Sequence, residues 1–258
     1  MKKLALLILL LSAAFQFQAR AISYTDSVQI ATHLSPLDSL KQELKLTQYD
    51  SLKAGIYAQI AAQYLKFDTI TNKKIKANYQ NEAINYTMLA LHGYSKYSDT
   101  LGMRTCFNNL TKVYRSQKKF SQAKWFILQS NTISRTIDDK PNIIASLIEL
   151  AGIKMDIKDY SLAMRDLNEA LKLSVDNHYA ATEAKVQESF AFYYSRTKNY
   201  AKEALALKRR DFINDSLAKS EKAMLAKANA QDTVQSKKKL MAMRKINRSV
   251  SSKRIASL

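Results

Sequence analysis

The feature that most constrains this chain is a helix-turn-helix pattern that recurs about every forty residues. An aromatic residue returns at intervals of forty positions, at Phe120, Tyr160 and Tyr200. A small residue follows each aromatic inside the next helix, at Ala123, Ala163 and, one place late, Ala204. The copies are separated by acidic turns, at Ser98-Asp99, Asp138-Asp139 and Asp176-Asn177. Self-similarity at a period of roughly 20–50 residues indicates a solenoid, in which every unit buries its apolar face against its neighbours.

The composition favours a fold made almost only of helices. Apolar residues make up 47% of the 258 residues, which argues against a generally disordered chain. The chain contains only 4 Gly and 2 Pro, whereas a β-rich fold needs many such residues for its tight turns. We therefore predict an all-α fold.

The positions of caps and apolar stripes predict a short helix followed by four helix pairs. Ser35 as cap and Pro36 at the first helical position begin the short helix, which ends near Leu46. Thr47 or Asp50 is the expected cap of the next helix. The predicted pairs span 50–67 and 77–96, 101–117 and 121–137, 142–157 and 161–175, and 180–196 and 201–213. The first pair has a longer connection, 68–76, and Asn214-Asp215 permits a further helix to start.

Several repeated positions resemble the tetratricopeptide repeat (TPR) family. An aromatic residue lies near the end of the first helix at Tyr64, Tyr114 and Tyr194, while the third repeat has Lys154 instead. The small residue of the second helix recurs at Ala83, Ala123 and Ala163. The family usually repeats at about 34 residues, so a period near forty implies helices that are each longer by most of a turn. The resemblance covers 50–215 and implies a right-handed α-solenoid of about four repeats with a C-terminal extended helix.

The N-terminus has the pattern of a secretory signal peptide. Two lysines precede the apolar run Leu4–Leu11, and the segment closes with Ala19-Arg20-Ala21. The apolar run is shorter than the roughly 20 residues that span a bilayer. We expect residues 1–21 to be removed after Ala21 and the protein to be periplasmic or secreted. Alternatively, this segment is an apolar helix that packs onto the solenoid, or it is not cleaved and the protein is an intracellular, basic repeat protein.

A narrower resemblance concerns the periplasmic repeat region of Bacteroidota-type TPR histidine kinases and regulators. It rests on the signal peptide, on four long repeats with acidic turns such as 97–100, and on the charged helix after Asp215. In that family the last helix usually leads into a membrane span, but nothing after Leu217 is apolar for more than two or three residues. The resemblance therefore implies either a stand-alone relative or a truncated sensor. The expected organisation is a signal peptide at 1–21, an N-terminal segment with a short capping helix at 22–49, the repeats at 50–215 and a basic helix or tail at 216–258.

Positive charge is concentrated near the C-terminus. The chain carries a formal net charge of +19, and 233–258 contains Lys and Arg but no acid. The stretch Lys237–Arg254 could contact an anionic membrane surface or an acidic partner. Alternatively, it is a solvated helix that frays after Asn247. It lacks the interleaved aromatic residues that single-stranded nucleic acids stack on, so nucleic acid is not a favoured partner.

The sequence shows no arrangement typical of catalysis. His33, His92 and His178 are isolated from one another, no two glycines lie close enough for a phosphate-binding loop, and the acids of the turns are better explained as caps. Cys106 is expected to be buried and inert. We therefore predict no catalytic residue, no metal, no cofactor and no enzymatic activity.

Binding is the function that a stacked helix-pair architecture offers. By the family resemblance, the first helices line a concave groove, and the candidate peptide-binding residues are Lys66, Asn108, Lys112, Arg115, Glu188, Phe192 and Arg196. Asn108, Lys112 and Arg115 share one helix face and could grip a carboxylate or the carbonyls of an extended peptide; alternatively, that face is simply solvated. The predicted function is an exported, non-enzymatic scaffold for a protein or peptide partner. The alternative is a component of a signalling system whose basic tail contacts a membrane or an inner-membrane partner.

Overall fold

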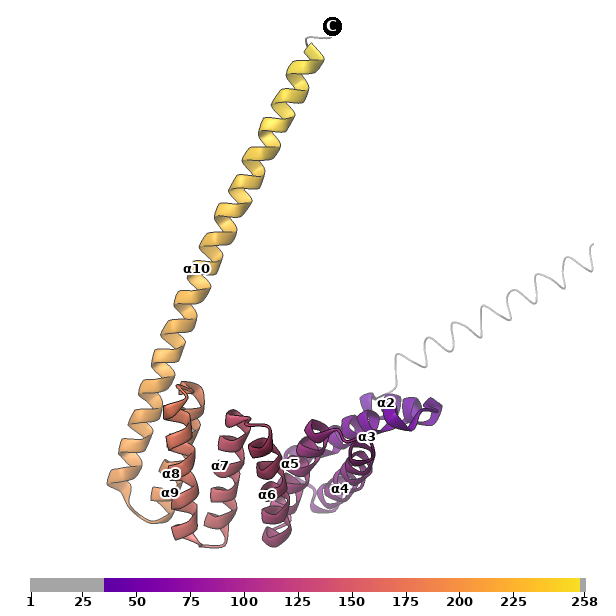
Figure 1. Cartoon of the computed structure of the whole chain (residues 1–258), viewed down its shortest axis with the longest axis vertical. Coiled ribbons are helices and arrows are strands. Elements are labelled where there is room, and N and C mark those ends of the chain that lie inside the picture. Colours follow the sequence, from indigo (N-terminus) through magenta and orange to yellow (C-terminus); the bar gives the residue numbers. More distant parts are fainter. Residues whose placement is uncertain (1–34, 256–258) are drawn as a thin grey trace, which may run out of the picture. The chain divides into compact units, whose positions relative to one another are not determined.

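The computed structural model describes residues 35–255, and within that range every regular element is a helix (Figure 1). The chain forms two compact units, one ending at Asp138 and the other beginning at Asp139. The all-α fold predicted from the composition is confirmed. The predicted signal peptide, 1–21, lies outside the described residues.

Unit 1 contains the first two helix pairs, the short helix that precedes them and a 3₁₀ segment. Its elements are α2 (Pro36–Leu46), α3 (Asp50–Tyr64), η1 (Leu65–Thr69), α4 (Lys73–Lys96), α5 (Thr100–Ser116) and α6 (Phe120–Thr136). Helix α2 packs against α3, and α3 pairs with α4, α4 with α5, and α5 with α6. One core cluster of the unit consists of Ile56, Ile60, Tyr64, Phe67, Ala83 and Val113.

Unit 2 contains two further helix pairs. Its elements are α7 (Lys140–Asp156), α8 (Tyr160–Asp176), α9 (Ala180–Arg196) and α10 (Tyr200–Ile255). Helix α7 pairs with α8 and α9 with α10, while α9 also contacts α7 and α8. The core runs through all four helices and includes Ile144, Leu147, Leu167, Val186, Phe190 and Ala206.

The helices from α5 onward follow a regular step of twenty residues. Helices α5 to α9 each contain 17 residues, and three residues join each to the next. The middle residue of each of these turns, and of the turn before α5, has positive φ between 56° and 65°: Ser98, Lys118, Asp138, Lys158, His178 and Lys198. In the turn after α5, the Lys118 N–H donates to the Arg115 carbonyl at 2.9 Å and the Lys119 N–H to the Tyr114 carbonyl at 2.8 Å. This is the Schellman pattern, which satisfies carbonyls that the helix end would leave unpaired.

The residue that closes a turn is also the N-cap of the next helix. The Asp99 carboxylate accepts from the Gly102 N–H at 2.9 Å, and the Asp139 carboxylate accepts from the Asn142 N–H at 3.3 Å. The first two predicted acidic turns therefore act as helix caps. The third differs, because Asp176 is the last residue of α8, and α9 is preceded by Tyr179 without a side-chain cap.

The N-terminal caps confirm one prediction and correct two. Ser35 Oγ accepts from the Asp38 N–H at 3.2 Å, and the short helix spans Pro36–Leu46 as expected. Neither Thr47 nor Asp50 caps α3, since the N-cap residue is Tyr49 and makes no side-chain hydrogen bond. The connection predicted at 68–76 is shorter, because the Asn72 side chain accepts from the N–H groups of 74 and 75 and starts α4 at Lys73.

Helix α10 passes through Asn214-Asp215 without the helix start expected there. Its first part packs on α9, where Ala206 and Ile213 are buried and Arg209 donates to Glu183 at 2.9 and 3.0 Å. Beyond Ile213 the described side chains are exposed, and the sequence lacks the Gly or Pro that would end a helix. The backbone remains helical to Ile255, past the fraying point expected at Asn247. No helix among the described residues is both long and apolar enough to cross a membrane.

The register of the last pair is not shifted. Tyr200 begins α10 as Tyr160 begins α8, so Glu203 occupies the position of Ala163. Ala204, which the sequence suggested as the displaced small residue, is exposed on α10. Glu203 is half-buried at this position, whereas Ala163 is fully buried.

We predict opposite stability effects from two glycine-to-alanine substitutions in the α3–α4 pair. A Cβ at Gly93 would lie 2.7 Å from the Cβ of buried Ala54, whereas a Cβ at Gly55 meets nothing within 4 Å. Gly93→Ala should lower the free energy of unfolding by about 1–3 kcal/mol because it forces the helices apart. Gly55→Ala, the matched control, should raise it by about 0.4–1 kcal/mol by restricting the unfolded chain. Urea denaturation of both variants measures the difference, and equal effects would contradict the close approach of α3 and α4.

Candidate functional site

Two candidate residues of unit 1 lie at the 3₁₀ segment η1: Lys66 is part of it, and Lys112 of α5 contacts it. The Lys112 ammonium lies 3.0 Å from the Asp68 carboxylate, 3.3 Å from the Leu65 carbonyl oxygen and 5.4 Å from the centre of the Phe67 ring. Phe67 is fully buried, so Lys112 ties η1 to α5 over an apolar anchor. Its ammonium already has three partners within the fold.

The other three unit 1 candidates differ in exposure. Lys66 is exposed and donates to the Gln63 side chain at 2.7 Å. Asn108 is exposed on α5, and Arg115 is half-buried near the end of the same helix. The structure therefore places Asn108, Lys112 and Arg115 on one helix, as the spacing predicted, but it gives Lys112 a structural role as well. Peptide binding by these residues stays a prediction.

The candidate residues of unit 2 include a pair that the structure brings together. On α9 the Arg196 guanidinium lies 4.8 Å from the centre of the Phe192 ring, and 44% of Phe192 is exposed. Arg196 is also 3.7 Å from the Asp156 carboxylate at the end of α7. An exposed aromatic ring and a cation that is paired with Asp156 therefore lie together on one surface. Glu188 has another neighbour, since its carboxylate is 3.9 Å from Arg210 of α10.

A second set of residues recurs where the two helices of each hairpin face one another. In the first three hairpins the fifteenth residue of the first helix meets the residue that stands ten places before the end of the second helix; we call this the pairing position. In the first hairpin Tyr64 stacks on Tyr86 at 5.8 Å and 11°. In the second, Tyr114 stacks on Phe126 at 5.4 Å and 9°.

The third hairpin replaces the rings by a buried ion pair. Lys154 and Asp166 form a salt bridge, and each side chain is only 5% exposed. Lys154 is the residue that departs from the aromatic pattern in the sequence. Its departure is compensated by a carboxylate on the partner helix at the position of Phe126. A buried charge needs such a partner, and Arg165 also approaches the Asp166 carboxylate at 3.8 Å.

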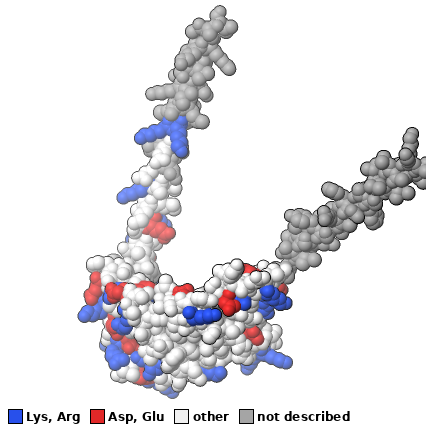
Figure 2. Space-filling view, turned by 45° about the vertical axis from the view of Figure 1, so that its right-hand side comes forward, with Lys and Arg blue, Asp and Glu red and all other residues white. Residues whose placement is uncertain are grey.

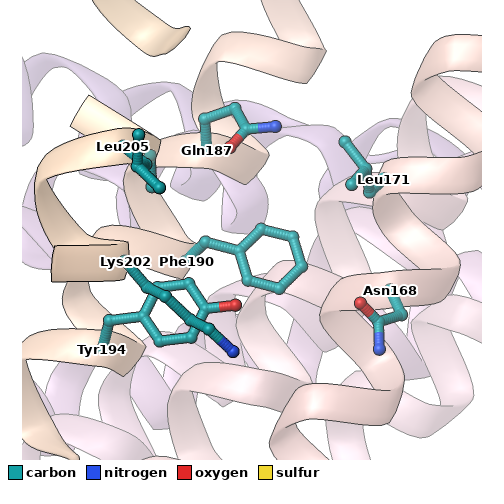
Figure 3. A pocket seen from close by; sticks show the side chains of 8 residues that line it. Asn168, Leu171, Gln187, Phe190, Tyr194, Lys202 and Leu205 are labelled. Atoms are coloured by element: carbon teal, nitrogen blue, oxygen red, sulfur yellow. The ribbon is translucent and has the colours of Figure 1, made fainter. Parts of the chain in front are cut away.

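The fourth hairpin leaves the pairing position partly empty. Counted from the start of the second helix, Ala206 corresponds to Phe126 and Asp166, and it belongs to the lining of one cavity together with Tyr194. A cavity of about 290 Å³ opens beside it between α8, α9 and α10. Its lining comprises Asn168, Leu171, Gln187, Phe190, Tyr194, Lys202, Leu205 and Ala206. Figure 3 shows Asn168 and Leu171 across the space from Lys202 and Leu205, with Phe190 between them.

The sequence pattern did not lead us to predict this cavity, although a small residue at a repeated core position could have indicated it. Phe190 and Tyr194 stack at 6.0 Å and 19° and form its aromatic wall. The Lys202 ammonium lies 5.7 Å from the centre of the Tyr194 ring. The equivalent position holds Phe126 in the second hairpin, Asp166 in the third and the much smaller Ala206 in the fourth. This loss of side-chain volume indicates where the core of a hairpin is incomplete.

On the face seen in Figure 2, the charged residues of the helix pairs do not form a patch of a single sign. In the face seen in Figure 2, Lys and Arg are interspersed with Asp and Glu over the repeats, and several Lys lie on the described part of α10. Lys237, Lys238 and Lys239 are exposed there.

Among the described residues no group of three His, Cys, Asp or Glu could hold a metal ion. Cys106 is 1% exposed, and burial, helped by nearby Asp99, raises the pKa of its thiol to about 12. The thiol is therefore neutral and unreactive near neutral pH, as expected for a buried cysteine.

Comparisons with known proteins define the fold. No protein-family profile and no curated protein matches the sequence. Among solved structures, apo RapI is 16% identical with a TM-score of 0.57 over 71% of this chain. BtubC from P. vanneervenii is 16% identical with a TM-score of 0.54, covering 79% of this chain and 75% of that protein. The TPR-like repeats of a Podosopora anserina kinesin light chain are 15% identical with a TM-score of 0.58, covering 78% and 93%.

These similarities show a TPR-like fold, as the repeat pattern predicted. The chain spans 63% of the length of RapI and 50% of a Rap protein complexed with Competence and Sporulation Factor, to which it is 17% identical with a TM-score of 0.56. At such identities the likeness concerns the arrangement of helices. What the surface binds depends on this chain's own residues.

We predict that the buried Lys154–Asp166 pair is costly to break but not to replace. Lys154→Met leaves the Asp166 carboxylate buried without its partner and should lower the free energy of unfolding by about 3–5 kcal/mol. Adding Asp166→Leu removes that orphaned charge and should restore stability to the wild-type value or above it. Lys172→Met, at an exposed position on α8, is the control and should have little effect. Chemical denaturation checks all three, and a double variant no more stable than Lys154→Met would refute the explanation.

Proposed function

We propose that this chain is an exported, non-enzymatic scaffold that binds a protein or peptide partner through the side of α9 that carries Phe192 and Arg196, which we call the first-helix face of unit 2. The observation that carries the proposal is the exposed Phe192 ring, whose centre lies 4.8 Å from the Arg196 guanidinium, which in turn is 3.7 Å from the Asp156 carboxylate. Aromatic residues and arginine dominate binding energy at protein interfaces. A pair that is already ordered loses less side-chain entropy when a partner binds.

The fold supports a binding role. Helix-pair repeats present extended surfaces for other molecules, and one similar structure is a Rap protein complexed with Competence and Sporulation Factor. The chain covers 50% of that protein, so the resemblance supports a scaffold role in general and does not identify a partner. Asn108 and Arg115 of α5 are further candidate contacts for the same kind of partner.

The non-enzymatic part of the proposal rests on the absence of a catalytic pattern. Nothing in the sequence combines a nucleophile with a base, and no metal group is found among the described residues. Export is proposed from the sequence pattern of residues 1–21 alone.

A second candidate function uses helix α10. Beyond Ile213 its described side chains are exposed, including the basic group Lys237–Lys239. A helix of this kind could carry a signal to a membrane surface or to an acidic partner, as in a sensor component of a signalling system. This candidate differs from the first because it requires the segment after Asp215.

We predict that Phe192→Ala weakens partner capture about tenfold or more. The measurement is a quantitative pull-down from an extract of the organism that encodes the chain, using the immobilised mature protein. Phe212→Ala is the matched control, because Phe212 is a 64% exposed ring on α10 with Arg209 lying 5.8 Å from its centre. The control should retain capture, whereas equal capture by wild type and Phe192→Ala would contradict the proposed face.

The same pull-down separates the two candidate functions. A chain that ends at Asp215 should capture the same partner as the full mature chain if the first-helix face is responsible. Loss of that partner from the shortened chain, with capture by Phe192→Ala intact, would instead assign binding to the α10 segment.

We predict that the mature protein begins at Ile22. N-terminal sequencing of protein from fractionated cells should give residues 22 onward in the periplasmic fraction, or in the medium if the protein is secreted. A cytoplasmic marker enzyme controls for leakage. An intact Met1 in the cytoplasm would refute export and leave the binding proposal to be judged by the pull-down.

A further inference from the structure

The fourth hairpin lacks the side chain that completes the others. At the pairing position two hairpins hold a second ring, and one holds a carboxylate paired with Lys154. Here Tyr194 and the small Ala206 both line a cavity of about 290 Å³. The geometry of the Tyr114–Phe126 stack, 5.4 Å and 9°, shows what this backbone accommodates when the position is filled by a ring.

We propose that this cavity binds the aromatic side chain of an acidic segment in a partner protein. The ring would lie against Tyr194 and Phe190, as Phe126 lies against Tyr114 in the second hairpin. The inference rests on the proposed scaffold function but adds a second recognition site. It names the chemical class of the partner, which the first-helix face does not.

The size of the cavity favours one side chain over a small-molecule cofactor. Small-molecule sites usually have volumes of roughly 300–1,000 Å³ and enclose most of the ligand, so this cavity lies at the lower limit. Its floor is apolar, since Phe190 is 5% and Ala206 6% exposed. Leu205 is 67% exposed at its edge, and it offers apolar contact to the backbone next to an inserted ring.

The charge at the edge of the cavity favours an acidic neighbour of that ring. Lys202 is the only charged residue in the lining, and no described carboxylate forms a salt bridge with its ammonium. The amides of Asn168 and Gln187 can donate to a partner's carbonyls or carboxylates. An acidic residue beside the aromatic would pair with Lys202, whereas a basic one would be repelled.

The cavity is distinct from the Phe192 surface. Phe190 and Tyr194 are each two residues away from Phe192, which is about 200° around an α-helix. They therefore point to the opposite side of α9, toward α8 and α10. A partner could engage one side of α9 without touching the other, so the two sites can be tested separately.

The test uses the full chain and a fluorescein-labelled peptide, Gly-Ser-Glu-Phe-Asp-Ser-Gly, in fluorescence anisotropy titrations. Ala206→Phe fills the cavity with the ring that the second hairpin carries, so it should weaken binding about tenfold or more while keeping or raising the thermal midpoint. Ala204→Phe is the matched control, because it adds the same ring at an exposed position outside the lining. It should bind as wild type does.

Two further measurements keep the proposal falsifiable if Ala206→Phe does not fold. Lys202→Glu, at the exposed edge, should also weaken binding about tenfold. The peptide with alanine in place of phenylalanine, and the one with lysines in place of its acids, should each bind more weakly than the original.

The outcomes distinguish this inference from the proposed function. Absence of saturable binding, or unchanged binding by a folded Ala206→Phe and by Lys202→Glu, would overturn the cavity as an aromatic site. If Phe192→Ala abolished peptide binding while Ala206→Phe left it intact, recognition would belong to the first-helix face. The scaffold would then stand without this second site.

Discussion

The rest of the structure depends on a three-residue turn that closes one helix and caps the next. A left-handed residue lets the chain reverse, and the following residue pairs its N–H with the ending helix before starting a new one. Because α5 to α9 are each 17 residues long, the turn fixes a step of twenty. Residues at equal steps therefore occupy equivalent places, which explains why the pairing position recurs at the same spacing in the second, third and fourth hairpins.

A fixed backbone register allows the side chains at that position to vary in chemistry. Stacked rings, a buried Lys154–Asp166 pair and a cavity beside Tyr194 occupy the same place in successive hairpins. The stacked rings are stabilised by dispersion, and the buried ion pair is stabilised because its two charges neutralise one another. The cavity leaves the contact unmade, so it is the position from which the core of unit 2 can accept an outside group.

The two candidate binding surfaces also follow from this register. Helix α9 carries Phe192 and Arg196 on one side and Phe190 and Tyr194 on the other. Asp156 fixes the first pair from α7, while α8 and α10 enclose the second. In unit 1, by contrast, Lys112 of α5 contacts Asp68 and the Phe67 ring and so attaches η1 to α5. A polar residue that the sequence pattern assigns to a binding face can therefore already have its partners within the fold.

The sequence by itself determined the helical class, the forty-residue period and most helix boundaries, because apolar spacing, Ser35-Pro36 and the capping acids act locally. It also showed that Lys154 departs from the pattern. Only the tertiary structure decided that Asp166 forms a buried salt bridge with Lys154, that a cavity lies beside Ala206, and that α10 continues through Asn214-Asp215. These outcomes depend on which side chains of separate helices face one another and on where packing ends. Local spacing carries no information about either.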